Sequence, residues 1–237
     1  MTGPSYKSDD VVVFDDVLPA GQFAALLRHL NGLDYTSVHA RGWRKVWRLH
    51  DGSPLTGRAG WYRPHDDPDE REILYPTGSP IDDLITWILD RLPDLETVVG
   101  APDTWDRMSF APWIYPPGSG LSLHQDGVLY TGAFTYYAHP QWQLHWGGYL
   151  VVLDPRTRPV DISAGELSPP FLTDAQESRR AFDPGIGLTV LPKPNRIAFL
   201  SPTALHLMTR VDQNAGQAAR ISVAGFFHKR VTPPAPR

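Results

Sequence analysis

Twenty-four prolines and 20 glycines are spread along the 237 residues of this chain rather than gathered in one segment. Both residue types favour turns, and the apolar residues between them stand in short runs. Short apolar runs that alternate with turn formers are typical of many short strands. The sequence therefore predicts a mainly β protein with flanking helices, in the α+β class.

Charge and composition exclude several classes of function. Twenty-six acidic residues against 22 basic ones give a formal net charge of −4, which provides no basic field for nucleic acid or an anionic membrane. The absence of cysteine excludes disulfides, thiolate zinc sites and cysteine catalysis. The polar first ten residues lack the apolar core of a secretory signal, and no apolar run is long enough for a spanning helix. We expect a cytoplasmic protein with neither a nucleic-acid nor a membrane partner.

Two helices are predicted in the N-terminal part, after a buried strand at 10–14. Apolar residues recur at helical spacing after Pro19 and predict a helix that ends near Gly32. Ser79 and Pro80 are typical of a helix start, and Pro93 is expected to end that helix.

Strands are predicted to dominate from residue 108 onward. They are expected at 108–115, 121–125, 132–137, 148–153, 188–191, 196–200 and 221–227. No linker separates this part from the helices, so a single domain over 1–237 is expected. In it, 1–105 supports a β core at 106–230, and 231–237 forms a loose tail.

One of the nine histidines, His124, stands two residues before Asp126 in the segment LSLHQDG at 121–127. Because residues i and i+2 of a strand project from the same face, both side chains can reach one metal ion. His206, which follows the apolar run at 196–200, is the candidate for a third ligand. Two imidazoles and one carboxylate leave three adjacent positions open, as iron(II) oxygenases require.

Arg220 and Ser222 share one face of the last predicted strand. A guanidinium pairs bidentately with a carboxylate, and a nearby hydroxyl adds a second bond to the same group. The pair therefore predicts a binding site for a carboxylate.

These residues resemble the iron(II)- and 2-oxoglutarate-dependent dioxygenases, in particular the prolyl-4-hydroxylase-like branch, over residues 108–228. The resemblance rests on YPPG at 115–118, LSLHQD at 121–126, FTYY at 134–137, WGGYL at 146–150, PKPNR at 192–196, His206, and RxSxxG at 220–225. Tyr149 stands where the family usually has a glutamate, which leaves the subfamily open and does not affect the metal site. The resemblance implies a double-stranded β-helix, a jelly-roll with the metal between its sheets.

The resemblance also implies a role for each candidate residue. His124, Asp126 and His206 are the implied Fe(II) ligands. The implied contacts of 2-oxoglutarate are Arg220 to its C5 carboxylate, with help from Ser222, and the hydroxyl of Tyr115.

The implied reaction consumes O2 and 2-oxoglutarate, releases succinate and CO2, and hydroxylates an unactivated C–H bond. Related halogenases have a small residue in place of Asp126, so a carboxylate here favours hydroxylation. Desaturation, ring formation and epimerisation stay open.

We expect the substrate to be amino-acid-like, either free or within a small peptide or a carrier-bound intermediate. Eighteen arginines against four lysines indicate a GC-rich genome, which favours natural-product tailoring. The segments 42–48 and 61–63 alternate aromatic and cationic residues, and they either line a substrate mouth or form half-exposed strands. The segment 154–187 is expected to be a long insertion, either a lid or a disordered loop.

Two further histidines are candidates for substrate contact, and a third, His228, ranks below the metal triad as an inward-facing residue. His139 and His145 flank Trp142 and are expected to be surface loop residues. His228 faces inward with Arg220 unless a bulge at Gly225 reverses it.

Two other functions remain compatible with the same motifs. One is a cupin-type metalloenzyme that does not use 2-oxoglutarate. The other is a metal-binding jelly-roll module without catalysis.

Overall fold

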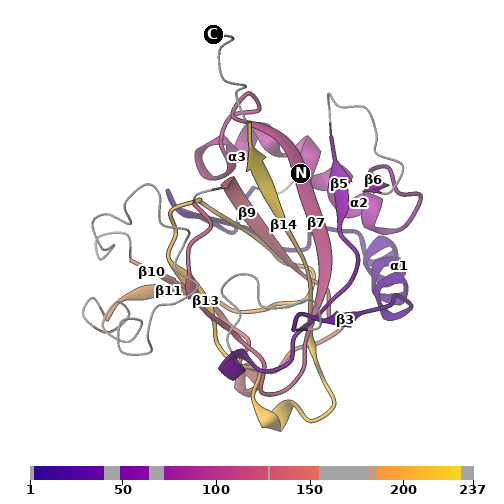
Figure 1. The fold of residues 1–237 in the computed structure, drawn as a ribbon, viewed down its shortest axis with the longest axis vertical. Helices are drawn as coiled ribbons and strands as arrows, with labels where there is room; N and C mark the ends of the chain where they lie inside the picture. Colours follow the sequence, from indigo (N-terminus) through magenta and orange to yellow (C-terminus); the bar gives the residue numbers. More distant parts are fainter. Residues whose placement is uncertain are drawn as a thin grey trace.

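Two β-sheets face each other in the computed structural model, and helices cover the outer side of the larger sheet (Figure 1). The structure describes residues 3–39, 49–63, 72–127, 129–154, 182 and 185–230. Three predicted features lie wholly or mostly outside these residues: the aromatic segment 42–48, the insertion 154–187 and the tail 231–237.

The larger sheet has ten described strands. Eight follow one another in the order β1 (Tyr6–Lys7), β2 (Val11–Phe14), β12 (Ile197–Leu200), β9 (Tyr130–Tyr137), β14 (Arg220–Lys229), β7 (Trp105–Tyr115), β4 (Leu55–Thr56) and β3 (Thr36–Ser37). Of the other two, β5 (Gly60–Tyr62) pairs with β7, and β6 (Ile73–Leu74) pairs with β5.

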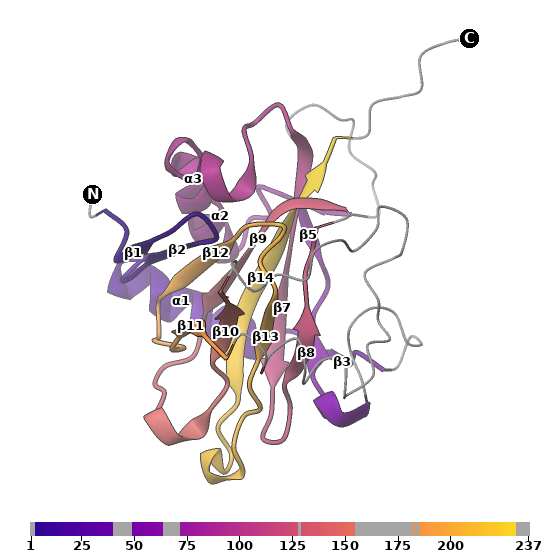
Figure 2. The ribbon, with the colours of Figure 1, turned by 90° about the vertical axis from the view of Figure 1, so that its left-hand side faces the viewer.

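The smaller sheet has four described strands, in the order β11 (Gly187–Val190), β10 (Leu150–Leu153), β13 (His206–Met208) and β8 (Leu121–His124). Figure 2 turns this sheet toward the viewer, in front of the long strands of the larger sheet. Two facing antiparallel sheets confirm the predicted fold class and the jelly-roll expected from the resemblance.

Alternation along β2 shows how the two sides of the larger sheet are used. Val11 and Val13 face the small sheet, where they pack in the same cluster as Leu150. Val12 and Phe14 face the other way and pack on the helices. Four consecutive buried apolar residues are therefore what a strand between two apolar layers requires.

Three helices supply the outer layer: α1 (Ala20–Asn31), α2 (Ile81–Asp90) and α3 (Leu92–Val99). Leu26 of α1, Ile85 of α2 and Leu95 of α3 are fully buried in the cluster that includes Phe199 of the larger sheet. The amphipathic pattern that predicted α1 is therefore confirmed, with Gly32 as its C-cap.

The prediction that Pro93 ends the second helix is wrong. That helix stops at Asp90, and Pro93 lies in the first turn of α3. Proline is tolerated there because the first helical N–H groups have no partner within the helix. The start is also shifted, since Pro80 rather than Ser79 is the residue before the first helical position.

Several strand boundaries differ from the prediction. The strand expected at 121–125 ends at His124, so Asp126 lies in the loop that follows. His206 lies on β13, a strand that the sequence did not predict. Gly225 does not bulge, because β14 stays in register with β7 from Arg220 to His228.

No helix in the described ranges is long and apolar enough to cross a membrane.

Candidate metal and carboxylate site

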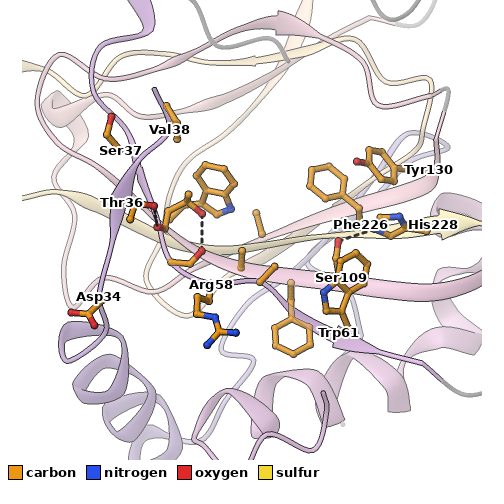
Figure 3. Close-up of a pocket in the computed structure, with 17 residues that line it drawn as sticks. Asp34, Thr36, Ser37, Val38, Arg58, Trp61, Ser109, Tyr130, Phe226 and His228 are labelled. Atoms are coloured by element: carbon orange, nitrogen blue, oxygen red, sulfur yellow. Dashed lines mark hydrogen bonds between the residues drawn. The ribbon is translucent and has the colours of Figure 1, made fainter. Parts of the chain in front are cut away.

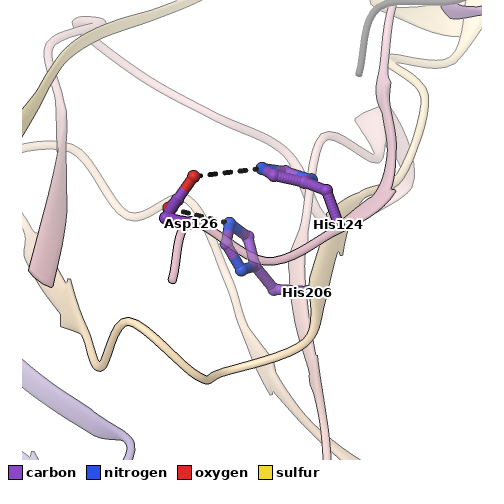
Figure 4. Close-up of side chains that lie close together, drawn as sticks. All are labelled: His124, Asp126 and His206. Atoms are coloured by element: carbon purple, nitrogen blue, oxygen red, sulfur yellow. Dashed lines mark ion pairs between the residues drawn. The ribbon is translucent and has the colours of Figure 1, made fainter. Parts of the chain in front are cut away.

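Three potential metal ligands converge at one end of the small sheet (Figure 4). His124 and His206 are paired neighbours on β8 and β13, and their ring centroids lie 4.2 Å apart. Asp126 reaches toward both rings, with Oδ1 4.0 Å from Nε2 of His124 and Oδ2 3.9 Å from Nε2 of His206. One ligand atom from each residue lies within 4.8 Å of the others, which is close enough to share one ion.

The face argument that paired His124 with Asp126 needs correction. Leu121 pairs with Met208 and His124 with His206, so β8 has one residue more than β13 over this stretch. The pairing places His124 directly beside His206 on β13. Asp126 then approaches from the loop, not from the same strand face.

Backbone carbonyls fix both imidazole rings. Nδ1 of His124 donates to the carbonyl of Ser122 at 2.8 Å, and Nδ1 of His206 donates to the carbonyl of Ala204 at 2.9 Å. A carbonyl oxygen only accepts, so each Nδ1 carries a proton, and Nε2, on the side of Asp126, is the nitrogen that the neutral ring offers to a metal. This is the tautomer that a metal-binding histidine needs.

The buried carboxylate of Asp51 stabilises this arrangement through Ser122. The hydroxyl of Ser122 donates to both oxygens of Asp51, at 2.8 and 3.0 Å, and Asp51 is only 3% exposed. Nε2 of His50 lies 3.1 Å from the same hydroxyl. Ser122 therefore links Asp51 to the carbonyl that holds His124.

The second part of the site is a buried arginine between two tyrosine rings. The guanidinium carbon of Arg220 lies 5.2 Å from the ring centre of Tyr115 and 4.8 Å from that of Tyr137. Its Nη1 is 3.5 Å from the hydroxyl of Ser222. The side chain is 4% exposed, and its Nε has no hydrogen-bond partner among the described residues.

Burial raises the pKa of both tyrosines above the ordinary value, although the positive charge of Arg220 opposes the shift. Both phenols are therefore neutral at physiological pH. The hydroxyl of Tyr137 has no hydrogen-bond partner in the described part of the chain. A cation and an unpaired buried hydroxyl are incompletely satisfied, which is the condition of a site built for a polar ligand.

One small cavity of about 90 Å³ joins the two parts of the site. His124, Asp126 and His206 line it together with Tyr115, Arg220 and Ser222. The structure thus brings all six sequence-predicted site residues together. Tyr137 was in a quoted motif without a role, and its pairing with Ser222 across β9 and β14 now places it beside Arg220.

Two other residues of the site were missed by the sequence analysis. Asp51 and Ser122 are 71 residues apart, and no local pattern connects them. His139 was expected on the surface, which is wrong. It is 1% exposed, and its Nε2 lies 2.8 Å from the carbonyl oxygen of Pro192, whereas His145 is exposed as expected.

No protein-family model matches this sequence. No curated protein matches it either.

Solved structures do share the fold. A prolyl-4-hydroxylase from Pseudomonas putida is 18% identical, with 94% of each chain covered and a TM-score of 0.56. A prolyl hydroxylase from Trichoplax adhaerens, solved with a peptide of hypoxia inducible factor, is 13% identical, with 94% of this chain and 84% of that chain covered and a TM-score of 0.57.

HygX from Streptomyces hygroscopicus, solved with nickel, 2-oxoglutarate and hygromycin B, is 13% identical. The alignment covers 94% of this chain and 84% of that chain, with a TM-score of 0.56. At these identities the comparison establishes the fold, and it is the fold that the sequence resemblance implied.

Proposed function

We propose that this chain is an iron(II)- and 2-oxoglutarate-dependent oxygenase. The observation that carries the proposal is the convergence of His124, Asp126 and His206 on the cavity that Arg220 also lines. Two imidazole nitrogens and a carboxylate on one side of an ion match the ligand set of non-haem iron(II) oxygenases. HygX, which shares the fold, was solved with a metal ion and 2-oxoglutarate together.

The residues present fit both groups. The paired Nε2 atoms and Asp126 supply the iron ligands, and the unpaired Nε of buried Arg220 supplies a bond for the distal carboxylate of 2-oxoglutarate. When bound, iron(II) and 2-oxoglutarate together supply the oxidising chemistry, with O2 consumed and succinate and CO2 released.

The side chains around Arg220 orient the cosubstrate. A guanidinium that is 4% exposed pairs strongly with a carboxylate because little water competes for either group. Ser222 and Tyr115 lie beside Arg220 and donate hydroxyl hydrogen bonds to the same ligand. Tyr137 does not line the cavity, and its ring holds the guanidinium of Arg220 from the other side.

The reaction that we propose is hydroxylation of an unactivated C–H bond in an amino-acid-like unit. Asp126 supports this outcome, since a third protein ligand leaves no position for a halide. Prolyl hydroxylases are among the proteins that share the fold. The epimerase SnoN also shares the fold. Product analysis therefore decides between hydroxylation and another outcome of the oxidation.

An anaerobic titration tests the proposal. Iron(II) and then 2-oxoglutarate are added to the purified protein, and the visible spectrum is recorded. We expect an absorption band that appears only when both are present and is lost in His124→Ala. Arg220→Ala should weaken 2-oxoglutarate binding by roughly tenfold to a hundredfold, because a charged hydrogen bond contributes about 1.5–3 kcal/mol.

Two results would contradict the proposal. Iron that binds at His124 without any effect of 2-oxoglutarate would identify a cupin-type enzyme. A protein that binds both ligands and never produces succinate with any substrate would be a binding module.

A further inference from the structure

A second and larger cavity, of about 570 Å³, shares lining residues with the metal cavity, and Figure 3 shows the side chains that line it. Its floor is the inward face of β7 and β14. Ala111 and Ser109 of β7 pair with Ala224 and Phe226 of β14, and all four line it. Pockets that hold drug-sized ligands occupy roughly 300–1,000 Å³, so this cavity has room for far more than a water cluster. We call it the distal chamber.

The distal chamber adjoins the candidate active site. Ala224 and Phe226 line both cavities, and the alternation of β14 puts them on the same face as Arg220 and Ser222. A molecule that presents a carbon to the metal cavity can therefore extend over these two residues into the distal chamber.

Aromatic rings form the walls of the distal chamber at both ends. Trp113 stacks on Tyr115 with an interplanar angle of 28°, on the side of the carboxylate pocket. Trp61 and Tyr130 enclose the ring of His228 at the far end, with centroid distances of 5.1 and 4.9 Å. Flat apolar walls of this kind favour a ligand with a ring, because rings bury a large area in preferred stacking geometries.

A polar pair lies within the aromatic end. Nε2 of His228 is 2.9 Å from the hydroxyl of Ser109, and both side chains border the distal chamber (Figure 3). His228 follows Ala224 by four residues on the strand, a separation of about 13 Å at 3.3 Å per residue. A substrate that reaches both the metal cavity and His228 must therefore be extended on the order of 10 Å.

We propose that the distal chamber binds the body of the substrate, and that this body is a ring-bearing substituent on the amino-acid unit to be oxidised. The inference rests on the proposed function and narrows it, because a free amino acid leaves most of the distal chamber empty. Trp61 contacts the ring, His228 with Ser109 contacts a hydrogen-bonding group near it, and Trp113 contacts the part of the substrate nearer Arg220.

Calorimetric titration of matched ligands tests the inference without turnover. The protein is loaded with nickel(II) and 2-oxoglutarate, and each of a set of amino acid methylamides is added twice, once N-acetylated and once N-benzyloxycarbonylated. The two forms differ only in the ring-bearing cap. For at least one amino acid we expect the ring-bearing form to bind roughly tenfold tighter or more, as burial of a phenyl ring predicts.

Filling the distal chamber should remove that preference. Ala111→Phe places a ring in the cavity from a position that does not line the metal cavity. It should equalise the two binding constants while nickel(II) and 2-oxoglutarate still bind. Trp61→Leu, which removes a wall instead of filling space, should reduce the preference independently. Ala20→Phe, exposed at the start of α1, is the matched control and should change nothing.

A third set of ligands distinguishes the source of the ring. The same amino acids are offered as acetyl-Phe dipeptide amides. Tighter binding of the dipeptides than of the benzyloxycarbonyl forms indicates a peptide substrate, and the reverse order indicates a conjugated small molecule. Either order supports a ring-bearing body.

Equal binding of the capped pairs, or a preference that survives both Ala111→Phe and Trp61→Leu, would overturn the inference. Failure of nickel(II) and 2-oxoglutarate to bind would overturn the proposed function instead, and this is measured first on the same sample.

Discussion

The ring of His124 is held by a chain of two hydrogen bonds that begins at a buried carboxylate. Asp51 accepts from the hydroxyl of Ser122, and the carbonyl of Ser122 accepts from Nδ1 of His124. Partners of this kind, behind the metal ligands, set the orientation and basicity of the imidazole. Asp51 and Ser122 are therefore positioning residues for the proposed iron site.

Removal of the Ser122 hydroxyl should weaken metal binding. We expect Ser122→Ala to lower the affinity for nickel(II) about tenfold. This is the lower end of the usual loss of metal affinity when a hydrogen-bond partner behind a metal ligand is removed. We expect the lower end because the carbonyl of Ser122 remains and only its hydroxyl bond to Asp51 is lost. Calorimetry measures the affinity. Thr77→Val, which removes a hydroxyl-to-carboxylate bond to Asp82 at the start of α2, should leave the affinity unchanged. Equal losses in both variants would refute a positioning role.

His139 gives the fold a pH dependence in the acid range. Burial lowers the pKa of its imidazole to about 4 from 6.5, against the opposing effect of the carbonyl of Pro192. Between these two values the unfolded chain binds the proton and the native chain does not. The contribution of His139 to the free energy of unfolding is therefore present in full above pH 6.5 and is lost as the pH falls toward 4.

The variant His139→Gln should remove this contribution. Urea unfolding at pH 7 and pH 4.5 gives the free energy of unfolding for each protein. The loss on acidification should be smaller in the variant by roughly 2–3 kcal/mol, from about two pKa units at 1.36 kcal/mol each. His145→Gln is exposed and should behave like the wild type. An identical loss in wild type and His139→Gln would show that His139 does not titrate in this range.

At the scale of elements, β14 organises both cavities. Its inward residues run in sequence from the proposed cosubstrate pocket at Arg220, past Ala224, to His228 in the distal chamber. The strand holds one register with β7 from Arg220 to His228. Gly225 lies on the outer face of the strand, against the ring of Phe134.

Substitution of Gly225 should disturb the packing between β14 and its neighbours. A Cβ there would collide with the carbonyl oxygen of Ser109 and the ring of Phe134. We expect Gly225→Ala to lower the free energy of unfolding by about 1–3 kcal/mol, the usual effect of overpacking. Gly21→Ala in α1, where nothing lies within 4 Å, should instead be neutral or stabilise by up to about 1 kcal/mol. Chemical unfolding distinguishes the two, and equal stabilities would contradict the close approach.

At the scale of the whole molecule, the proposed ligands connect parts of the fold that are distant in sequence. His124 and His206 lie on two strands of the small sheet, and Asp126 lies in a loop. Arg220 belongs to the larger sheet. A metal ion with 2-oxoglutarate would therefore bridge the two sheets.

Ligand binding should raise the thermal stability in two steps. Nickel(II) at a hundred times its Kd adds about 2.7 kcal/mol, which for a chain of this size raises Tm by roughly 5–10 °C. Addition of 2-oxoglutarate should raise Tm further. His206→Ala should lose both steps, and Arg220→Ala only the second. Scanning calorimetry measures the midpoints, and a metal effect that persists in His206→Ala would place the ion elsewhere.

Local sequence patterns predicted much of the fold and of the candidate site. The dispersed turn formers predicted the β class, and the spacing of apolar residues predicted α1 and most long strands, because burial on one face imposes a periodicity that any short window reveals. The triad and Arg220 were predicted as site residues from residue type, order and family resemblance. Pro93 was misread because its effect depends on whether a helix begins or ends there.

Only the tertiary structure decided which residues from distant parts of the chain are in contact. Asp51 meets Ser122, and Trp61 meets His228, through contacts between elements far apart in the chain. His139 is buried because the loop at Pro192 and the start of β14 at Ile221 lie against it. No periodicity encodes such pairs, since they depend on how the two sheets and their loops pack in space. The distal chamber, and with it the proposed class of substrate, follows from that packing alone.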